Sequence, residues 1–247
     1  MKLFLLQTRS EIKRIFRNPY FVFWSLFMPL VFYFVFTNVF NTDMPDQGLW
    51  DAHFLMSIAA FSVMGSSIMT LGIRLVEERT QGWSIYLSTT PLPPAAYFAS
   101  KMAGQSAVHV FSILFIFFAG YLINGVRLSP AEWVLGGVWI LLASLPFLAL
   151  GVLIGAMRRV DTASGVSNLI YLGLAITGGM WMPMEVLPEM LQAVGKWLPA
   201  YSYGNGAWEI IRGHAPEWRD MAILTAYLLL FMALAILIRN RQEAMRT

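Results

Sequence analysis

Residues 74–101 read RLVEERTQGWSIYLSTTPLPPAAYFASK and form a polar island between two long apolar segments. A run of charged residues at the start of the island is followed by apolar residues three to four positions apart, a pattern typical of an amphipathic helix. The proline-rich residues 91–94 would then stop the helix, because proline lacks the backbone donor. We expect a surface helix over residues 77–90, with these key positions: Glu77, Glu78, Arg79, Gly82, Trp83, Tyr86 and Leu87.

The composition places this island in a membrane protein. Of the 247 residues, 57% are hydrophobic and only 13% are charged, whereas an average soluble domain carries about 25% charged residues. The absence of cysteine excludes disulfides, thiolate metal sites and cysteine nucleophiles. We therefore expect lipid to surround most of the chain as one transmembrane domain covering residues 1–247.

The first 19 residues combine basic side chains with apolar ones at helical spacing. Such a helix lies in the headgroup region and extends its cations toward lipid phosphate. Anionic membrane lipid is the simpler partner for these cations than nucleic acid, because the segment adjoins an apolar span. We predict an interfacial helix over residues 1–19 rather than a cleavable signal peptide.

Six apolar stretches are long enough to be bilayer spans, which need about 20 residues each. We expect proline to kink the first at Pro29 and to bend the fourth at Pro146. The fold class is therefore all-α, with transmembrane helices expected at residues 20–40, 54–73, 102–123, 133–157, 163–182 and 221–238.

Residues 183–213 are too long for a turn and too apolar for a solvated loop. Pro188 can begin a helix that Pro199 ends, and the turn-rich residues 201–206 lead into a second short apolar segment. Neither segment is long enough to cross a bilayer. We expect a re-entrant helical hairpin in the outer leaflet, with its irregular backbone sheltered by protein.

The positive charges set the expected orientation. Thirteen of the 17 Lys and Arg residues fall in residues 1–19, in the central island, at residues 158–159 and in the tail. Cytoplasmic segments carry this excess of Lys and Arg. The pattern predicts a multi-pass protein of the cell membrane with both termini and the island in the cytoplasm.

Little in the chain indicates catalysis. It has no G-x-x-x-x-G-K-[ST] phosphate loop, and His53, His109 and His214 lack the spacing of a metal site, so we expect no catalytic residue and no metal. His109 is expected to make a structural hydrogen bond between helices. A polar stripe in the second span, at Ser62, Ser66 and Thr70, fits either close helix packing or a substrate path.

The Glu77-Glu78 pair leaves one enzymatic alternative open. Intramembrane peptidases use paired glutamates to activate water as a general base. Those enzymes hold their glutamates inside the membrane and need histidines on neighbouring spans. Here the pair opens a polar surface helix, which favours another role.

The island resembles a signature of ABC-2 type transporter permeases, with Glu77-Glu78-Arg79, Gly82, Tyr86-Leu87-Ser88, Pro91 and the later Lys101. Residues 178–183, GGMWMP, with Leu187-Pro188, Trp197-Leu198-Pro199, Tyr201 and Arg212-Gly213, are similar to the second signature of that family. The two motifs occur in the family's order and topology across most of the chain.

The resemblance implies an export permease without its own cofactor, driven by a separate ATPase subunit that binds ATP and Mg. Residues 77–90 would be the coupling helix that contacts this ATPase. A second permease copy, identical or paralogous, would complete a dimer. The expected cargo is amphipathic, such as a drug, antibiotic, lipopeptide or lipid. Another open alternative is a membrane sensor of lipids or antibiotics that does not transport.

The same resemblance assigns two further sets of residues. The substrate path would run between the two copies, and its candidate residues are Tyr33, Ser62, Ser66, Asn168 and Tyr171. The hairpin would act as an outer gate, with candidate residues Pro183, Pro188, Trp197 and Pro199.

Overall fold

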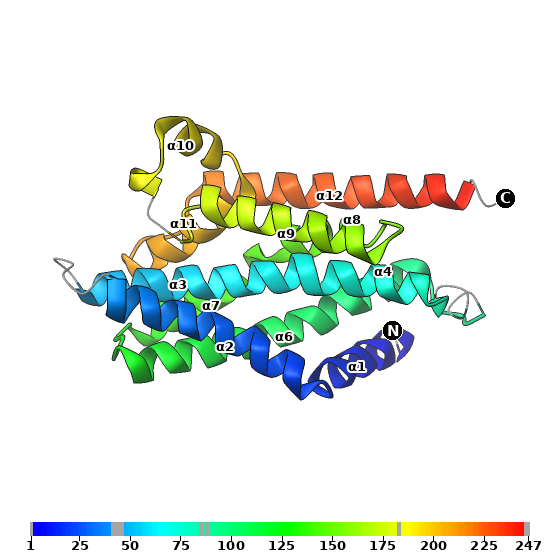
Figure 1. Cartoon of the computed structure of the whole chain (residues 1–247), viewed down its shortest axis with the longest axis horizontal. Coiled ribbons are helices and arrows are strands. Elements are labelled where there is room, and N and C mark those ends of the chain that lie inside the picture. The colour runs from blue at the N-terminus through cyan, green and yellow to red at the C-terminus, as the bar shows by residue number, and fades with distance from the viewer. Residues whose placement is uncertain (1, 41–46, 84–85, 87–88, 182–183, 245–247) are drawn as a thin grey trace.

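The computed structural model describes residues 2–40, 47–83, 86, 89–181 and 184–244, and the described residues form helices without strands. Figure 1 shows an elongated bundle in which the long helices run along one axis. Helix α1 (Lys2–Phe16) and the C-terminus lie at one end, which we call the α1 end. Helix α10 (Glu189–Gly195) lies at the opposite end, which we call the α10 end.

The centre of the bundle is one unbroken helical rod of 34 residues, Gln47–Thr80. It consists of α3 (Gln47–Gly65), the π-helical turn η2 (Ser66–Leu71) and α4 (Gly72–Thr80). Most of α3 is buried, and its side chains supply much of the hydrophobic core.

This rod corrects the expected boundary between the second span and the surface helix. The helix does not restart at Glu77, because α4 already contains Glu77, Glu78 and Arg79. Gly72 keeps helical angles of φ −62° and ψ −52° and packs against Ile154, so nothing interrupts the rod there.

The remaining long helices surround the rod (Figure 1). Among the described residues, four helices are long and apolar enough to cross a bilayer, and they are Gln47–Thr80, Pro94–Ile123, Pro130–Ile154 and Trp218–Ile238. A shorter apolar helix covers Leu26–Val39. The surrounding elements are α2 (Pro19–Val35), the π-helical η1 (Phe36–Phe40), α6 (Pro94–Ile123), α7 (Pro130–Ala143), α8 (Leu145–Ile154), α9 (Val160–Thr177) and α12 (Trp218–Ala244).

Proline and glycine shape the ends of these helices. Helix α2 continues through Pro29. The fourth expected span is divided at Ser144, and Pro146 lies in the first turn of α8, where its missing N–H costs no hydrogen bond. Helix α9 ends at Thr177, before the expected residue 182, because Gly179 adopts φ +74° and turns the chain away.

Glycines allow α8 to pack closely against the central rod. A Cβ atom on Gly151 would collide with the backbone carbonyl of Ser67, and one on Gly155 would lie 2.7 Å from Leu75 Cβ. Small residues at such positions are what allow helix backbones to approach closely in membranes. The α8 contact therefore depends on the absence of side chains at two positions one helical turn apart.

The segment between α9 and α12 forms a hairpin at the α10 end, but its helices differ from the expected ones. It contains the 3₁₀ turn η3 (Met184–Val186), α10 and α11 (Pro199–Ile211). Pro199 begins a helix instead of ending one, and the turn-rich residues 201–206 are helical. The glycines of this segment make room for indole rings, because a Cβ on Gly206 would overlap the Trp139 indole and one on Gly204 would crowd Trp208.

Helix α11 is buried and hydrogen-bonded to three neighbouring helices. The Tyr203 hydroxyl donates to the Ile140 carbonyl at 2.9 Å, and Trp208 Nε1 donates to Ser57 Oγ at 2.9 Å. Asn205 Nδ2 donates to Asp220 Oδ2 at 2.8 Å. These bonds join α11 to α7, α3 and α12, so protein shelters this part of the hairpin.

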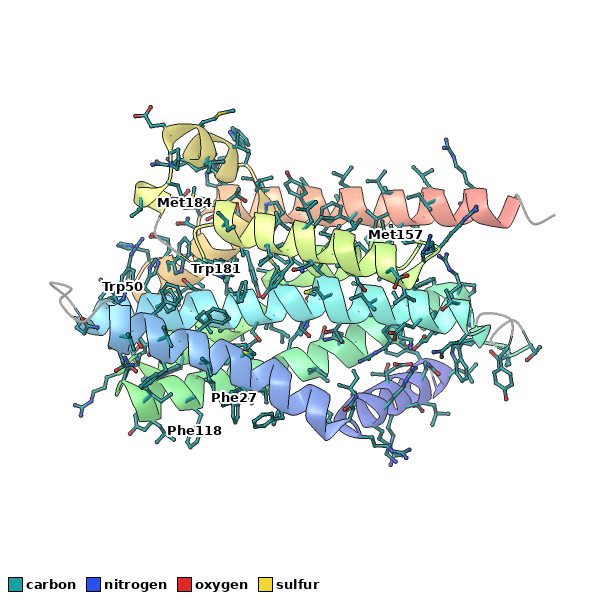
Figure 2. The ribbon with its side chains drawn as sticks, in the orientation of Figure 1. Phe27, Trp50, Phe118, Met157, Trp181 and Met184 are labelled. Carbon is teal, nitrogen blue, oxygen red and sulfur yellow. The ribbon has the colours of Figure 1, made fainter. Side chains whose placement is uncertain are left out.

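Aromatic side chains cover both the interior and the surface of the bundle (Figure 2). Trp181, just after α9, packs edge-on against Phe61 of α3, with ring centroids 5.7 Å apart. Phe27 on α2 and Phe118 on α6 are exposed instead. Apolar side chains exposed along such helices are expected where the surroundings are lipid.

Candidate functional site

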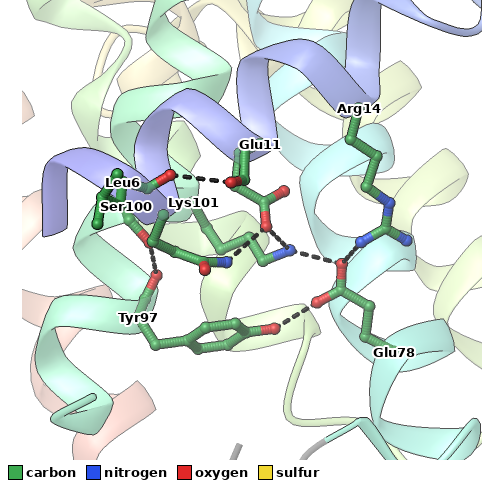
Figure 3. A network of polar contacts seen from close by, with 9 residues as sticks. Leu6, Glu11, Arg14, Glu78, Tyr97, Ser100 and Lys101 are labelled. Atoms are coloured by element: carbon green, nitrogen blue, oxygen red, sulfur yellow. Dashed lines mark hydrogen bonds and ion pairs between the residues drawn. The ribbon is translucent and has the colours of Figure 1, made fainter. Parts of the chain in front are cut away.

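A cluster of charged side chains lies at the α1 end, where the central rod, α1 and α6 meet (Figure 3). Lys101 of α6 is at its centre. The Lys101 ammonium lies 2.5 Å from Glu78 Oε1 and 2.6 Å from Glu11 Oε1. One cation therefore bridges two carboxylates that come from α4 and α1.

Glu78 also binds two other side chains. The Arg14 guanidinium pairs with Glu78 Oε1, and the Tyr97 hydroxyl donates to Glu78 Oε2. Both oxygens of this carboxylate are thus engaged, and Glu78 is only 3% exposed.

The cluster satisfies the electrostatic requirement for buried charge. The Lys101 side chain is 1% exposed, and an isolated buried ammonium or carboxylate would be strongly unfavourable. Lys101 and Arg14 offset the two carboxylates, and the partly buried Arg74 also interacts electrostatically with them. The Lys101 ammonium lies 5.3 Å from the centre of the Tyr97 ring. Losing a single partner would leave an uncompensated charge.

Helix geometry brings the cluster together. Gln7 and Glu11 are one turn apart on α1, and Gln7 Nε2 donates to Glu11 Oε1 at 2.9 Å. On α6, Tyr97 and Lys101 are likewise four residues apart. Gly104 lets α1 lie close to α6, since a Cβ there would come within 2.9 Å of Glu11 Cβ.

The three charged residues proposed for ATPase coupling, Glu77, Glu78 and Arg79, differ in their surroundings. Glu77 is exposed, whereas Glu78 faces the cluster. Arg79 Nη2 donates to the Ala156 carbonyl at 2.9 Å, which joins the end of α4 to the end of α8. In this arrangement the Glu78 carboxylate is occupied by side chains of its own chain, whereas Glu77 is open to contact.

The same geometry removes the basis for an intramembrane peptidase. That chemistry needs a pair of carboxylates free to activate water. Glu78 is held by Lys101, Arg14 and Tyr97, and Glu77 points to the surface. The buried residue acts as part of an ion-pair network.

Beyond the cluster, the chain turns at Gly82, which has φ +77°. Trp83 and Tyr86 follow, with their rings stacked at a centroid distance of 5.4 Å. Both are exposed, Trp83 by 41% and Tyr86 by 63%. We call this pair the aromatic knob. Leu87 lies outside the described residues.

The substrate-path candidates do not form one open surface in the single chain. Tyr33 and Ser62 are buried, and Tyr171 stacks on Phe61 at a centroid distance of 4.6 Å. Asn168 alone among the five candidates is exposed. Ser66 lies in the π-helical turn η2 and accepts a hydrogen bond from Gln105 at 2.5 Å.

The polar stripe therefore includes helix-packing contacts. The neighbouring Ser67 donates to the Val63 carbonyl and lies 3.4 Å from His109 Nε2. His109 is fully buried, in agreement with the expected structural contact between helices. π-helical turns such as η2 shift the register of a helix face and are frequent at functional sites.

The gate candidates lie at the α10 end. Pro188 precedes α10 and Pro199 begins the buried α11. Trp197, between the two helices, is exposed, and its ring lies 4.8 Å from the Arg219 guanidinium. Pro183 lies outside the described residues.

Glu11, Arg14, Tyr97 and Lys101 were not predicted as partners of Glu78. Two signals could have indicated them. Glu11 is a single acid in an otherwise basic segment, and Lys101 begins a long apolar stretch. Within the described residues, no group of three His, Asp or Glu side chains is placed to bind a metal.

These features define a multi-pass helical membrane protein, and sequence comparison identifies its family. The ABC-2 type transporter family matches residues 2–211, so the chain belongs to that family. As a permease of this type, it is a membrane component of a transport system and not itself an enzyme.

Two relatives from Bacillus subtilis (strain 168) extend the comparison. The chain is 58% identical over 238 residues to a protein named as a transport permease, YvfS, covering 96% of this chain and 97% of the relative. It is 24% identical over 189 residues to the linearmycin resistance permease protein LnrN, covering 71% of this chain and 46% of that protein.

Proposed function

We propose that this permease is the membrane subunit of an ATP-driven exporter whose ATP and Mg are bound by a separate ATPase subunit. The observation that carries the proposal is the aromatic knob, because Trp83 and Tyr86 are exposed and lie five and eight positions after Glu78 of the buried ion-pair cluster. Large exposed aromatic residues are typical anchors of protein interfaces. The knob supplies such anchors for the ATPase.

The proposed orientation places the α1 end in the cytosol. Helix α1, the end of the rod, the link between α8 and α9 and the C-terminal end of α12 all lie at this end (Figure 1). These are the segments that hold most of the Lys and Arg residues, as expected for the cytoplasmic side. With α2 and α9 crossing as well, the chain has six spans and both termini in the cytosol.

The cluster gives the knob a mechanical role. Glu78, Lys101 and Glu11 join the end of the rod to α6 and α1, so a force applied at the knob reaches three helices together. Arg79 extends the connection to α8. Nucleotide binding in the ATPase would then shift the permease between two states through a difference in contacts.

The path for cargo lies between two permease copies, on the face formed by α2 and α9. On α9, Asn168 is exposed, and Gly165 and Gly173 have open space around them, so a neighbouring helix can approach closely. Exposed phenylalanines on α2 give this face an apolar character. The combination fits an amphipathic cargo such as a drug, antibiotic, lipopeptide or lipid, and the α10 end serves as the outer gate.

Cysteine labelling tests the orientation, because the chain has no cysteine of its own. We expect Gln81→Cys to react with a membrane-impermeant maleimide only after cells are opened, whereas Arg127→Cys reacts in intact cells. Labelling of Gln81→Cys in intact cells would exclude contact with a cytosolic ATPase. Reconstitution of the permease with its co-purifying ATPase then tests whether ATP hydrolysis depends on the knob.

A further inference from the structure

A groove opens on the side of the bundle formed by α7, α11 and α12. It has a volume of about 790 Å³, within the usual range for small-molecule sites of about 300–1,000 Å³. Leu135, Val138 and Leu142 of α7 form one wall, and Leu224 and Leu228 of α12 form part of the other. These helices belong to two of the candidate membrane spans, so the groove opens toward lipid.

The groove has one polar end. Its rim at the α10 end contains Ser129 and Glu132 from the start of α7 and His214 from the link between α11 and α12. Ser129 and Glu132 form a capping box, with Glu132 Oε2 accepting from the Ser129 amide at 2.7 Å. His214 Nδ1 lies 3.1 Å from Glu209 Oε2. The rim thus combines a carboxylate with a nearby imidazole above apolar walls.

The longer wall of the groove, on α7, is comparable in length with one leaflet of a bilayer. Its lining runs along the chain from Ser129 to Pro146, which corresponds to roughly 25 Å of helix at about 1.5 Å per residue. One leaflet with its headgroup region is about 20 Å thick, half of a complete bilayer. The α7 wall is therefore long enough to span one leaflet, whereas the α12 wall runs only from Met221 to Leu228, roughly 10 Å.

We propose that this groove binds one acyl chain of a zwitterionic phospholipid from the leaflet at the α10 end. The headgroup lies at the polar rim, with its ammonium near the Glu132 carboxylate. A helix of a second copy is a poorer fit for the groove. Such a helix is about 10 Å wide and would need a surface to contact along the whole membrane span. The lipid is a resident ligand rather than cargo, since the proposed cargo path uses α2 and α9.

Photolabelling tests this site. The purified permease is placed in nanodiscs that contain phosphatidylethanolamine with a diazirine in its acyl chain, and labelled peptides are mapped by mass spectrometry. We expect adducts to concentrate on Leu135, Leu142 and Leu228. Leu228→Trp fills the groove and should lower their yield about tenfold, corresponding to about 1.4 kcal/mol of binding free energy.

The matched control is Leu229→Trp, because Leu229 is 65% exposed on the same helix and does not line the groove. It should leave the labelling unchanged. Val138→Trp fills the groove from the opposite wall and should repeat the loss if Leu228→Trp folds poorly. A uniform distribution of adducts along all exposed helices would overturn the proposed site. Disulfide cross-linking of two copies through Leu228→Cys would also overturn it, because a second copy would then occupy the groove. Equal labelling by a phosphatidylglycerol probe would overturn the headgroup assignment.

Discussion

The Lys101 ammonium lies 2.5 Å from the Glu78 carboxylate, in an almost fully buried contact between α6 and the end of the central rod. Both residues belong to the polar island of residues 74–101, and Glu11 of α1 accepts from the same ammonium at 2.6 Å. Their contact closes the island into a loop whose base is fixed, and the aromatic knob projects from this loop.

We predict that Lys101→Ala is strongly destabilising. It removes the cation shared by Glu78 and Glu11, and breaking a buried ion pair typically costs about 3–5 kcal/mol. Thermal unfolding followed by fluorescence-detected size exclusion would measure this loss. Arg14→Ala is the control, since the Arg14 side chain is 51% exposed and its loss should have a much smaller effect. Equal effects of the two substitutions would contradict the central role of Lys101.

The cluster should also behave as one energetic unit. Glu78→Gln and Lys101→Gln each leave a partner unpaired, while the double variant removes both charges. We expect the double variant to lose less stability than the sum of the single losses, because contacting residues couple by about 0.5–3 kcal/mol. Strict additivity would show that the two side chains do not interact in the membrane.

Gly151→Ala should disturb the contact between α8 and the rod. A Cβ at this position meets the Ser67 carbonyl oxygen, so the helices must separate, and overpacking of this kind costs about 1–3 kcal/mol. Gly137→Ala provides the matched control, since a Cβ there makes only ordinary contacts, at 3.4 Å from Phe117 and 3.5 Å from Ile113. The control should be neutral or stabilising in the same unfolding assay. A neutral Gly151→Ala would argue against close packing of these helices.

Tyr203→Phe should weaken the anchoring of α11. The substitution removes the hydrogen bond to the Ile140 carbonyl but keeps the ring that packs on Phe147. A lost hydrogen bond costs about 0.5–1.5 kcal/mol, and the unpaired buried carbonyl adds to this. The midpoint of thermal unfolding should fall, whereas Tyr227→Phe on the partly exposed α12 should leave it unchanged.

We predict that Trp83→Ala and Tyr86→Ala impair the contact with the ATPase without destabilising the permease. Both side chains are exposed, so we expect little change in thermal unfolding. In the reconstituted complex, each substitution should reduce binding of the ATPase and cargo-stimulated ATP hydrolysis. Tyr121→Ala is the control, since Tyr121 is also exposed but lies at the end of α6 near the α10 end. Cargo-stimulated ATP hydrolysis at the unsubstituted rate in Tyr86→Ala would refute the proposed role of the knob.

Much of the architecture could be predicted because it depends on local patterns. Uninterrupted apolar runs predicted the positions of α2, α6 and α12, and the positive charges predicted which segments gather at the α1 end. The motifs of the island and of residues 178–213 predicted the ABC-2 family, which the match over residues 2–211 confirms.

The errors occurred where long-range contacts override local signals. Gly204 and Gly206 indicate a turn when read alone, but in the fold they make room for Trp208 and Trp139, and the segment is helical. Glu78 reads as a surface charge because it has charged neighbours in the sequence. Its partners lie 64 and 23 positions away, at Arg14 and Lys101.

Composition and residue spacing were enough to predict a multi-pass helical permease and the residues that could cross a bilayer, because both act locally. The burial of Glu78 and the accessibility of Trp83 and Tyr86 became apparent from the fold alone. Burying a charge is favourable only when distant helices bring opposite charges and hydrogen-bond donors to it, and no local pattern reports such contacts.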